Sequence, residues 1–238
     1  MTIPNDLTHI AFDADDTLWG HEHIFVDAKS RCTELLQPYL SPEMDLEKEL
    51  YRFERKNLLI FGYGVKGFVL SMIETAIELS NGRITGFELQ QIIDLGKEMI
   101  AHPIELLPYV EEALAQLGQY YTLLIITKGD LFDQENKIAR SGIAHHFTHC
   151  EIVSEKTAAT YADIFRRHQI DPGKLLMIGN SLRSDVLPVM EAGGHAAHLP
   201  YKFTWHHERV GEGDLTSSYF RPESLEQLTH QLLAIQSS

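Results

Sequence analysis

Short runs of apolar residues alternate along the chain with longer segments in which apolar residues recur every three or four positions. The runs that suit buried strands are residues 9–12, 121–126, 150–153, 175–178 and 196–199. Helical patterns lie between the later runs, at residues 110–117, 132–141, 158–168 and 186–192. Strands that alternate with helices in this way predict an α/β fold, a Rossmann-like doubly wound parallel sheet covered by helices on both faces.

Roughly a hundred residues separate the first predicted strand from the second, far more than one crossover connection needs. Helical patterns fill this stretch, and Thr85 is a candidate N-cap for the last of them. These helices are predicted at residues 24–36, 46–59, 68–79 and 87–100. We therefore expect a separate helical domain, residues 20–102, inserted into an α/β core domain made of residues 1–19 and 103–238.

Polar residues that could take part in catalysis or ligand binding follow the predicted strands. They are Asp13 and Asp15 after the first strand, Thr127 and Lys128 after the second, Lys156 after the third, and Asn180 and Asp185 after the fourth. Ligands of open parallel sheets bind at the carboxyl ends of the strands. If the strands are neighbours, these side chains converge on one edge of the sheet.

The residue types at this edge suit phosphoryl transfer. Asp13 and Asp15 repel each other unless a cation lies beside them, and Mg²⁺ prefers carboxylate and carbonyl oxygens as ligands. Asp185 would add a third carboxylate, and Lys156 would add positive charge for the phosphoryl oxygens. One carboxylate can attack phosphorus. The other can protonate the leaving oxygen and later activate water.

In these residues the chain resembles the haloacid dehalogenase-like hydrolases, in the phosphatase branch with a helical cap inserted after the first strand. The family's motifs occur in the family's order: Asp-x-Asp-x-Thr as Asp13, Asp15 and Thr17, a Ser or Thr as Thr127, a lysine as Lys156, and an acidic motif at residues 179–185. The helical insert corresponds to the family's cap domain. The resemblance covers the whole chain apart from the divergent sequence of this insert.

The resemblance implies a role for each matching residue. Asp13 would be the nucleophile that forms an aspartyl-phosphate and would also be a magnesium ligand. Asp15 would be the general acid/base, and its backbone carbonyl would contact the metal. Lys156 would neutralise the nucleophile and the phosphate.

The remaining matches imply phosphate and metal contacts. Thr127 and the backbone amide of Lys128 would hold the phosphoryl oxygens, while the Lys128 side chain could point into solvent. Asp185 would bind magnesium directly or through water. Many members of the family have Asp at the position of Asn180; an amide oxygen can still bind the metal or its water, although the site loses one negative charge.

Four functions compete. The first is a magnesium-dependent phosphatase acting on a small phosphate monoester, and a phosphomutase could use the same aspartyl-phosphate. A 2-haloacid dehalogenase has the same fold and needs no magnesium, but dehalogenases replace the second aspartate of the first motif, and this chain retains Asp15. A catalytically silent binding protein is the alternative that is not an enzyme.

Other segments have both a structural and a functional interpretation. Residues 13–17 taken alone could be a turn with a helix cap. The Gly62–Gly67 segment is typical of a turn between helices, although it could instead be a loop that selects the substrate. Trp19 and the Trp205-His206-His207 segment could line a pocket, although packing is the default role of aromatic residues.

Composition and net charge limit the classes of molecule that this chain is expected to bind. The net charge is −14, which disfavours nucleic acids and anionic membranes but not a small phosphorylated metabolite bound by local charges. No apolar run approaches the roughly 20 residues that span a bilayer, and the N-terminus does not resemble a signal peptide. Cys32 and Cys150 are predicted to be two buried free thiols, which favours a cytoplasmic protein. Apolar helices in the insert could support a homodimer.

Overall fold

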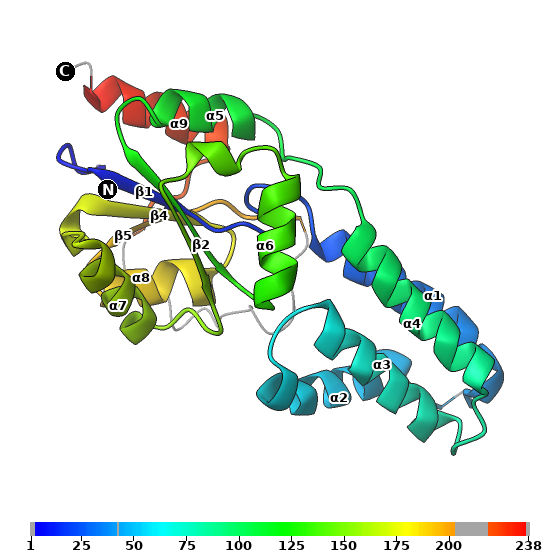
Figure 1. Cartoon of the computed structure of the whole chain (residues 1–238). Helices are drawn as coiled ribbons and strands as arrows, with labels where there is room; N and C mark the ends of the chain where they lie inside the picture. The colour runs from blue at the N-terminus through cyan, green and yellow to red at the C-terminus, as the bar shows by residue number, and fades with distance from the viewer. Residues whose placement is uncertain (1–2, 42, 203–218, 237–238) are drawn as a thin grey trace. The chain divides into compact units, whose positions relative to one another are not determined.

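The computed structural model describes residues 3–41, 43–202 and 219–236, which form two compact units (Figure 1). The α/β unit consists of residues 1–22 and 104–238, and the helical unit consists of residues 23–103. No helix in these described ranges is long and apolar enough to cross a membrane.

The α/β unit contains a parallel five-stranded sheet in the order β3-β2-β1-β4-β5. The strands are β1 (His9–Phe12), β2 (Thr122–Lys128), β3 (His149–Val153), β4 (Leu175–Gly179) and β5 (His195–His198). In the register of the central strand, Phe12 lies opposite Ile125 of β2 and Ile178 of β4. The carboxyl ends of these three strands therefore lie side by side, and the predicted α/β fold is confirmed.

Alternate residues of the strands pack into two cores on opposite faces of the sheet. Ile10 and Phe12 face a core that contains Leu114 of α5 (Val110–Leu117) and Leu228 of α9 (Leu225–Gln236). Ala11 faces the other core, with residues of α7 (Ala158–His168) and α8 (Leu187–Glu191). Figure 1 shows α5 and α9 together on one side of the sheet and α7 with α8 on the other. The sheet is covered on both faces because its strands are apolar on both faces.

The helical unit contains α1 (Glu22–Leu36), α2 (Leu46–Phe61), α3 (Val65–Leu79) and α4 (Gly86–Ala101). Its core includes Leu36, Met72 and Ile92. Thr85 begins α4 with the predicted N-cap, and Glu88 completes a reciprocal capping box. Between α2 and α3, Gly62 and Gly64 have positive φ angles, so the Gly62–Gly67 segment includes the turn that was predicted there.

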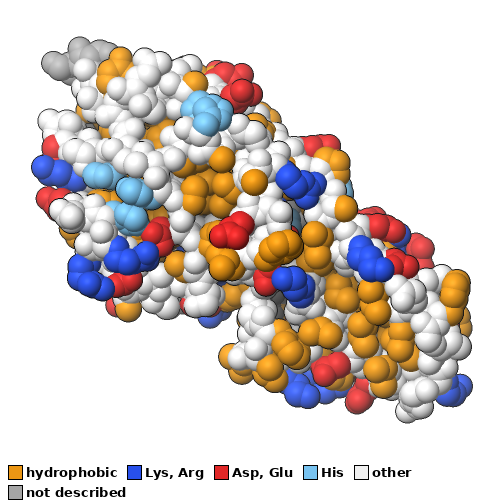
Figure 2. All heavy atoms as spheres, viewed as in Figure 1, with side chains coloured by type: hydrophobic (Ala, Val, Ile, Leu, Met, Phe, Trp, Pro, Cys, Tyr) orange, Lys and Arg blue, Asp and Glu red, His pale blue; other side chains and the backbone are white. Residues whose placement is uncertain are grey.

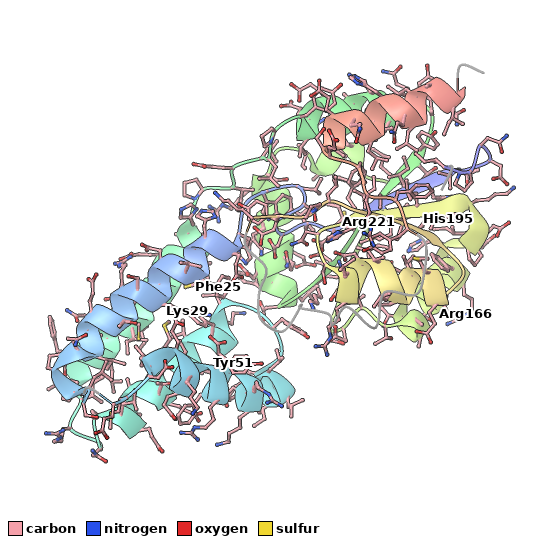
Figure 3. All side chains as sticks on the ribbon, turned by 180° about the vertical axis from the view of Figure 1, so that it is seen from behind. Phe25, Lys29, Tyr51, Arg166, His195 and Arg221 are labelled. Atoms are coloured by element: carbon pink, nitrogen blue, oxygen red, sulfur yellow. The ribbon has the colours of Figure 1, made fainter. Side chains whose placement is uncertain are left out.

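One face of the helical unit combines charge with aromatic rings. Phe25 of α1 packs edge to face on Phe68 of α3 with ring centroids 5.0 Å apart, and the Lys29 ammonium lies 5.6 Å from the Phe68 centroid. Lys29 also lies 3.5 Å from the buried Glu54 carboxylate. Figure 3 labels Phe25 and Lys29 on α1 and Tyr51 on α2. Figure 2 shows hydrophobic side chains gathered on the exposed surface of this unit.

The structure differs from the sequence prediction in three places. The helix predicted at residues 186–192 is a π-helical turn, η4 (Leu182–Val186), followed by the short α8, because Pro188 fits only the first turn of an α-helix. Helix α9 was not predicted, although its N-cap Ser224 and the apolar spacing after it gave a signal. Cys32 is buried as predicted, but the prediction was wrong for Cys150, which is exposed.

Candidate active site

Two carboxylates and one ammonium group meet at the carboxyl edge of the sheet. Asp13 directly follows β1, and its backbone amide donates to the carbonyl of Ile178 at 2.9 Å. Lys156 lies in the loop after β3, and Asp185 lies in η4 after β4. The Lys156 Nζ donates to Asp13 Oδ1 at 2.6 Å and to Asp185 Oδ1 at 2.6 Å. Residues from three strand ends thus form one charged cluster.

Burial decides the electrostatics of this cluster. Asp13 is 8% exposed and Lys156 3% exposed. Burial raises the pKa of Asp13 to about 7, although Lys156 opposes the shift, and the charge of Asp185 adds to it. Burial alone would lower the pKa of Lys156, but Asp13 and Asp185 raise it above its ordinary value. Lys156 therefore stays charged, and a second cation beside Asp13 would favour the ionised form of the Asp13 carboxyl group.

One hydroxyl group contacts the Asp13 carboxylate, and another contacts the side chain at the end of β2. The Thr17 hydroxyl donates to Asp13 Oδ2 at 3.1 Å, so the third residue of the first motif orients the first. Thr127 is buried and is the second-last residue of β2. The Lys128 Nζ donates to Ser184 Oγ at 2.9 Å and lies 3.8 Å from the Glu155 carboxylate. The expectation that this side chain points into solvent is wrong.

Asp185 is held close to the backbone of β4. Its Oδ2 accepts from the Ser181 amide at 2.9 Å, and the Ser181 hydroxyl accepts from the Ser184 amide at 3.0 Å. A Cβ atom on Gly179 would lie 2.2 Å from Asp185 Oδ2, so only glycine allows this approach. Asn180 donates nothing to this arrangement: its backbone carbonyl accepts from His198 Nε2 at 2.9 Å, and its side-chain amide makes no hydrogen bond within the described part of the chain.

Asp15 has different surroundings from Asp13. Its Oδ1 accepts from the Trp19 indole at 2.7 Å, and its Oδ2 accepts from Gln134 Nε2 at 2.9 Å. The Lys137 ammonium donates to both oxygens, at 2.8 and 2.7 Å. Burial alone would raise the pKa of Asp15, but His21, Lys137 and these hydrogen bonds hold it well below its usual range. Trp19 is buried as packing requires, and it also orients this carboxylate.

The structure adds two residues that sequence reasoning missed, Gln134 and Lys137 on α6 (Leu131–Arg140). Both are buried polar residues, three positions apart, so they share one face of the helix. The sequence shows only that Gln134 and Lys137 share one face of a predicted helix whose first apolar residues, 131 and 132, lie elsewhere on it. Nothing in the sequence indicated that this face turns inward.

Asp16 is a structural neighbour of the site. Its φ angle is 61°, and its carboxylate accepts from the backbone amides of His21 at 2.7 Å and Glu22 at 3.2 Å, where α1 begins. Burial raises the pKa of Asp16 to about 6 against the effect of these two hydrogen bonds. The residues Trp205, His206 and His207 lie outside the described residues.

The oxygen atoms available at this edge of the sheet are of the types that bind magnesium. Asp13 and Asp185 offer carboxylates, Asp15 offers a backbone carbonyl and Asn180 offers an amide oxygen, all hard oxygen ligands. Within residues 3–41, 43–202 and 219–236, no three Asp, Glu, His or Cys side chains are grouped so that they could hold an ion by themselves. Two carboxylates would therefore need carbonyl, amide and water oxygens to complete the coordination, which is the usual composition for Mg²⁺.

Known proteins resemble this chain over most of its length. The family model of the haloacid dehalogenase-like hydrolases matches residues 7–193. A crystal structure of a haloacid dehalogenase-like family hydrolase from Xanthomonas campestris is 38% identical, with a TM-score of 0.85 over 98% of this chain and 93% of that chain. No protein of curated function matches the sequence.

More distant structures share the fold alone. The 2-haloacid dehalogenase from Pseudomonas syringae is 19% identical, with a TM-score of 0.63 over 96% of this chain and 99% of its own. A hydrolase of the same family from Bacillus subtilis, solved with bound magnesium, is 17% identical, with a TM-score of 0.63 over 95% of this chain and 98% of its own. The fold thus occurs both in a dehalogenase and in a magnesium-bound hydrolase.

Proposed function

Because this chain belongs to the haloacid dehalogenase-like hydrolases, we propose that it is a magnesium-dependent phosphatase acting on a small phosphate monoester. The fold alone does not select this activity, since it also occurs in a dehalogenase. The observation that carries the proposal is the pair of aspartates after β1. Asp13 contacts the Lys156 ammonium, and Asp15 is retained and fixed by its own hydrogen bonds. A second carboxylate has a use in phosphate-ester chemistry, as an acid and then a base, which dehalogenation does not require.

The first half of the proposed reaction forms a covalent intermediate. The Thr127 hydroxyl and the Lys128 amide hold the phosphoryl oxygens, and the charge of Lys156 stabilises the charge that develops on them. An oxygen of Asp13 attacks phosphorus while the bond from phosphorus to the ester oxygen breaks. In the substrate complex Asp15 carries a proton, which requires Lys137 to give up one of its two hydrogen bonds to this carboxyl group. The ester oxygen takes that proton, and the alcohol leaves.

The second half releases phosphate. Asp15, now a carboxylate, takes a proton from a water molecule whose oxygen attacks phosphorus, and the bond to the Asp13 oxygen breaks. Magnesium, held by Asp13, Asp185, the Asp15 carbonyl and Asn180, would supply further positive charge to the phosphoryl oxygens. Asp13 returns to its starting state, so each cycle consumes one ester and one water.

The helical unit is proposed to act as the family's cap domain and to select the substrate. A phosphomutase is the second candidate, because the same aspartyl-phosphate could return its phosphoryl group to a substrate hydroxyl. The proposed substrate is a class, the small phosphate monoesters.

A screen of phosphorylated metabolites against the purified protein would identify the compound that it hydrolyses.

The deciding experiment compares phosphate release with halide release. We expect p-nitrophenyl phosphate to be hydrolysed with Mg²⁺ and not after chelation with EDTA, and 2-chloropropionate to be left unchanged. Halide release without metal would replace the proposal with a dehalogenase. Failure to release phosphate from any ester of a metabolite panel, at any Mg²⁺ concentration, would leave a binding protein.

A further inference from the structure

The side chain of Lys128 links two strand ends at the carboxyl edge of the sheet. Lys128 is the last residue of β2, and its side chain is only 15% exposed. Its Nζ donates at 2.9 Å to the hydroxyl of Ser184, which lies in η4 after β4. Because β1 lies between β2 and β4, this hydrogen bond joins the strand ends on either side of the strand that Asp13 follows. The same ammonium group lies 3.8 Å from the carboxylate of Glu155, the residue before Lys156.

Ser184 is held by hydrogen bonds to three parts of the α/β unit. Its hydroxyl accepts from Lys128 of β2, and its carbonyl accepts from the Tyr161 hydroxyl of α7 at 3.0 Å. Its amide donates to the Ser181 hydroxyl at 3.0 Å. Ser184 and Tyr161 are both buried. Asp185 is the next residue, so the contacts that fix the backbone at Ser184 also fix the position from which the Asp185 side chain projects.

The turn η4 takes part of its hydrogen bonding from side chains outside it. Within the turn, the Val186 amide donates to the Ser181 carbonyl five residues back, at 3.3 Å. π-Helical turns of this kind are rare and frequently occur at functional sites. Pro188 cannot donate to the Ser184 carbonyl four residues back, and the Tyr161 hydroxyl donates to it instead. The shape of the turn therefore depends on its neighbours.

Stability alone gives little reason for a lysine at position 128. A largely buried ammonium group loses hydration, and an apolar side chain would fill the same space without that loss. The ion pair with Glu155 is weak, because the Glu155 side chain is 45% exposed to water. The positive charge also disfavours a second cation nearby. The hydrogen bond to the residue beside Asp185 accounts for the lysine better than its charge does.

We propose that Lys128 is a positioning residue that acts through Ser184 to hold η4, so that Asp185 stays placed to bind magnesium. The inference rests on the proposed magnesium-dependent phosphatase and deepens it, because it assigns the placement of one metal ligand to a side chain of β2. Neither the Lys128 ammonium nor the Ser184 hydroxyl needs to touch the metal or the ester. The backbone amide of Lys128 keeps its separate role with the phosphoryl oxygens.

The test measures Mg²⁺ binding itself, from the rise in Tm of the substrate-free protein as Mg²⁺ is titrated. We expect Lys128→Met to raise the Kd for Mg²⁺ about tenfold, an effect typical of residues that orient a metal ligand. The direction is informative, because removal of a positive charge would by itself tighten the binding of a cation. Ser184→Ala leaves the net charge unchanged and should raise the Kd by a similar factor.

The two changes should not add. Each single change breaks the same hydrogen bond, so the double variant should bind Mg²⁺ no more weakly than Lys128→Met alone. Lys128→Arg keeps the charge and the donors and should recover most of the affinity. At saturating Mg²⁺, the KM of Lys128→Met for p-nitrophenyl phosphate should stay within about twofold of the wild type, because the backbone amide is retained.

The matched control is Lys174→Met, the same substitution at the amino end of β4, which should leave the Kd for Mg²⁺ unchanged. Unchanged or tighter Mg²⁺ binding in Lys128→Met would overturn the inference, and so would additive losses in the double variant. A higher KM at saturating Mg²⁺ with an unchanged Kd would assign the Lys128 side chain to the phosphate group instead.

The folding of each variant is checked by its Tm without Mg²⁺. If Lys128→Met does not fold, Ser184→Ala decides by the same titration, and an unchanged Kd there overturns the inference. The proposed function fails separately, in the wild type, if Tm does not respond to Mg²⁺ or if no phosphate ester is hydrolysed. The inference then falls with it.

Discussion

Asp13 and Asp15 are separated by one residue in the sequence, yet their surroundings act on them in opposite directions. Burial raises the pKa of Asp13 to about 7, whereas His21, Lys137 and hydrogen bonds keep the pKa of Asp15 below its usual range in spite of burial. Pairs of carboxyl groups whose environments separate their pKa values commonly have different roles in one reaction. The proposed mechanism needs the reverse order: Asp13 ionised, which a cation beside it would favour, and Asp15 protonated in the first half, against the effect of Lys137.

Replacing the nucleophile tests the proposal at the scale of a residue. Asp13→Asn should lower phosphatase kcat at least about 1000-fold, because an amide oxygen does not form the aspartyl-phosphate. The variant should remain folded, since Asn keeps the shape: its oxygen can still accept from Lys156, and its amide nitrogen can donate to the Thr17 hydroxyl oxygen. The measurements are steady-state kinetics with Mg²⁺ and a thermal melt. Activity close to that of the wild type would exclude Asp13 as the nucleophile.

Asp16 predicts a pH dependence of stability. Its pKa is about 6 in the folded protein and 3.8 as the reference value, so the folded state binds more protons between these values. Stability from this group is therefore fully present below about pH 4 and is lost as pH rises through about 6. Relative to Asp16→Asn, the wild type should lose on the order of 1 to 3 kcal/mol of unfolding free energy between pH 4 and pH 7.

Urea unfolding at a series of pH values measures this difference. Gln90→Ala in the helical unit is a suitable control, because Gln90 is an exposed residue and should leave the pH profile unchanged. Parallel profiles for the wild type and Asp16→Asn would show that burial does not raise the pKa of Asp16.

At the scale of elements, the end of β4 is built around a contact between a glycine and a carboxylate. In Gly179→Ala the added methyl group would lie 2.2 Å from Asp185 Oδ2, so Asp185 must move. We expect a loss of about 1 to 3 kcal/mol in stability and a larger relative loss in magnesium-dependent activity. Gly86→Ala is the matched control, because a Cβ there meets nothing within 4 Å and should leave activity unchanged. Activity in Gly179→Ala equal to that of this control would separate Asp185 from the reaction.

The sequence predicted the central strands well because β1, β2 and β4 are buried apolar runs that end at polar residues. β1 and α7 have the predicted boundaries, and the other strands differ by one or two residues. The cluster of Asp13, Lys156 and Asp185 could be anticipated from the parallel order, since each residue follows a strand of the same parallel sheet. The contacts of Asp15 could not, because Gln134 and Lys137 approach from a helix more than a hundred positions away whose first two residues, both apolar, are exposed. The local pattern of α6 predicts the opposite orientation.

At the scale of the whole molecule, the net charge of −14 coexists with the proposed site for an anionic substrate. The long-range field opposes the approach of a phosphate ester, so binding depends on local cations such as Lys156 and the proposed magnesium ion. The charge of Lys156 is largely compensated by Asp13 and Asp185, which leaves a need for the metal.

Metal binding should stabilise the folded protein against heat. Mg²⁺ at about 100 times its Kd should add about 2.7 kcal/mol to the unfolding free energy, seen as a rise in Tm. Asp185→Asn should lose most of this rise, whereas Asp94→Asn, an exposed change in the helical unit, should retain it. An equal rise in Tm for Asp185→Asn would place the magnesium elsewhere.

After β5 the chain returns to the edge of the sheet at Phe220, and this pairing bears on aggregation in concentrated solution. The Phe220 amide donates to the Ala196 carbonyl, and the Phe220 carbonyl accepts from the His198 amide, each at 2.9 Å. These bonds occupy backbone groups that would otherwise template a strand from another molecule. At the opposite edge, Glu151 of β3 carries charge and pairs with Arg167 and His168. The two edges of the sheet are thus protected from edge-to-edge aggregation in different ways, the β5 edge by backbone pairing and the β3 edge by charge.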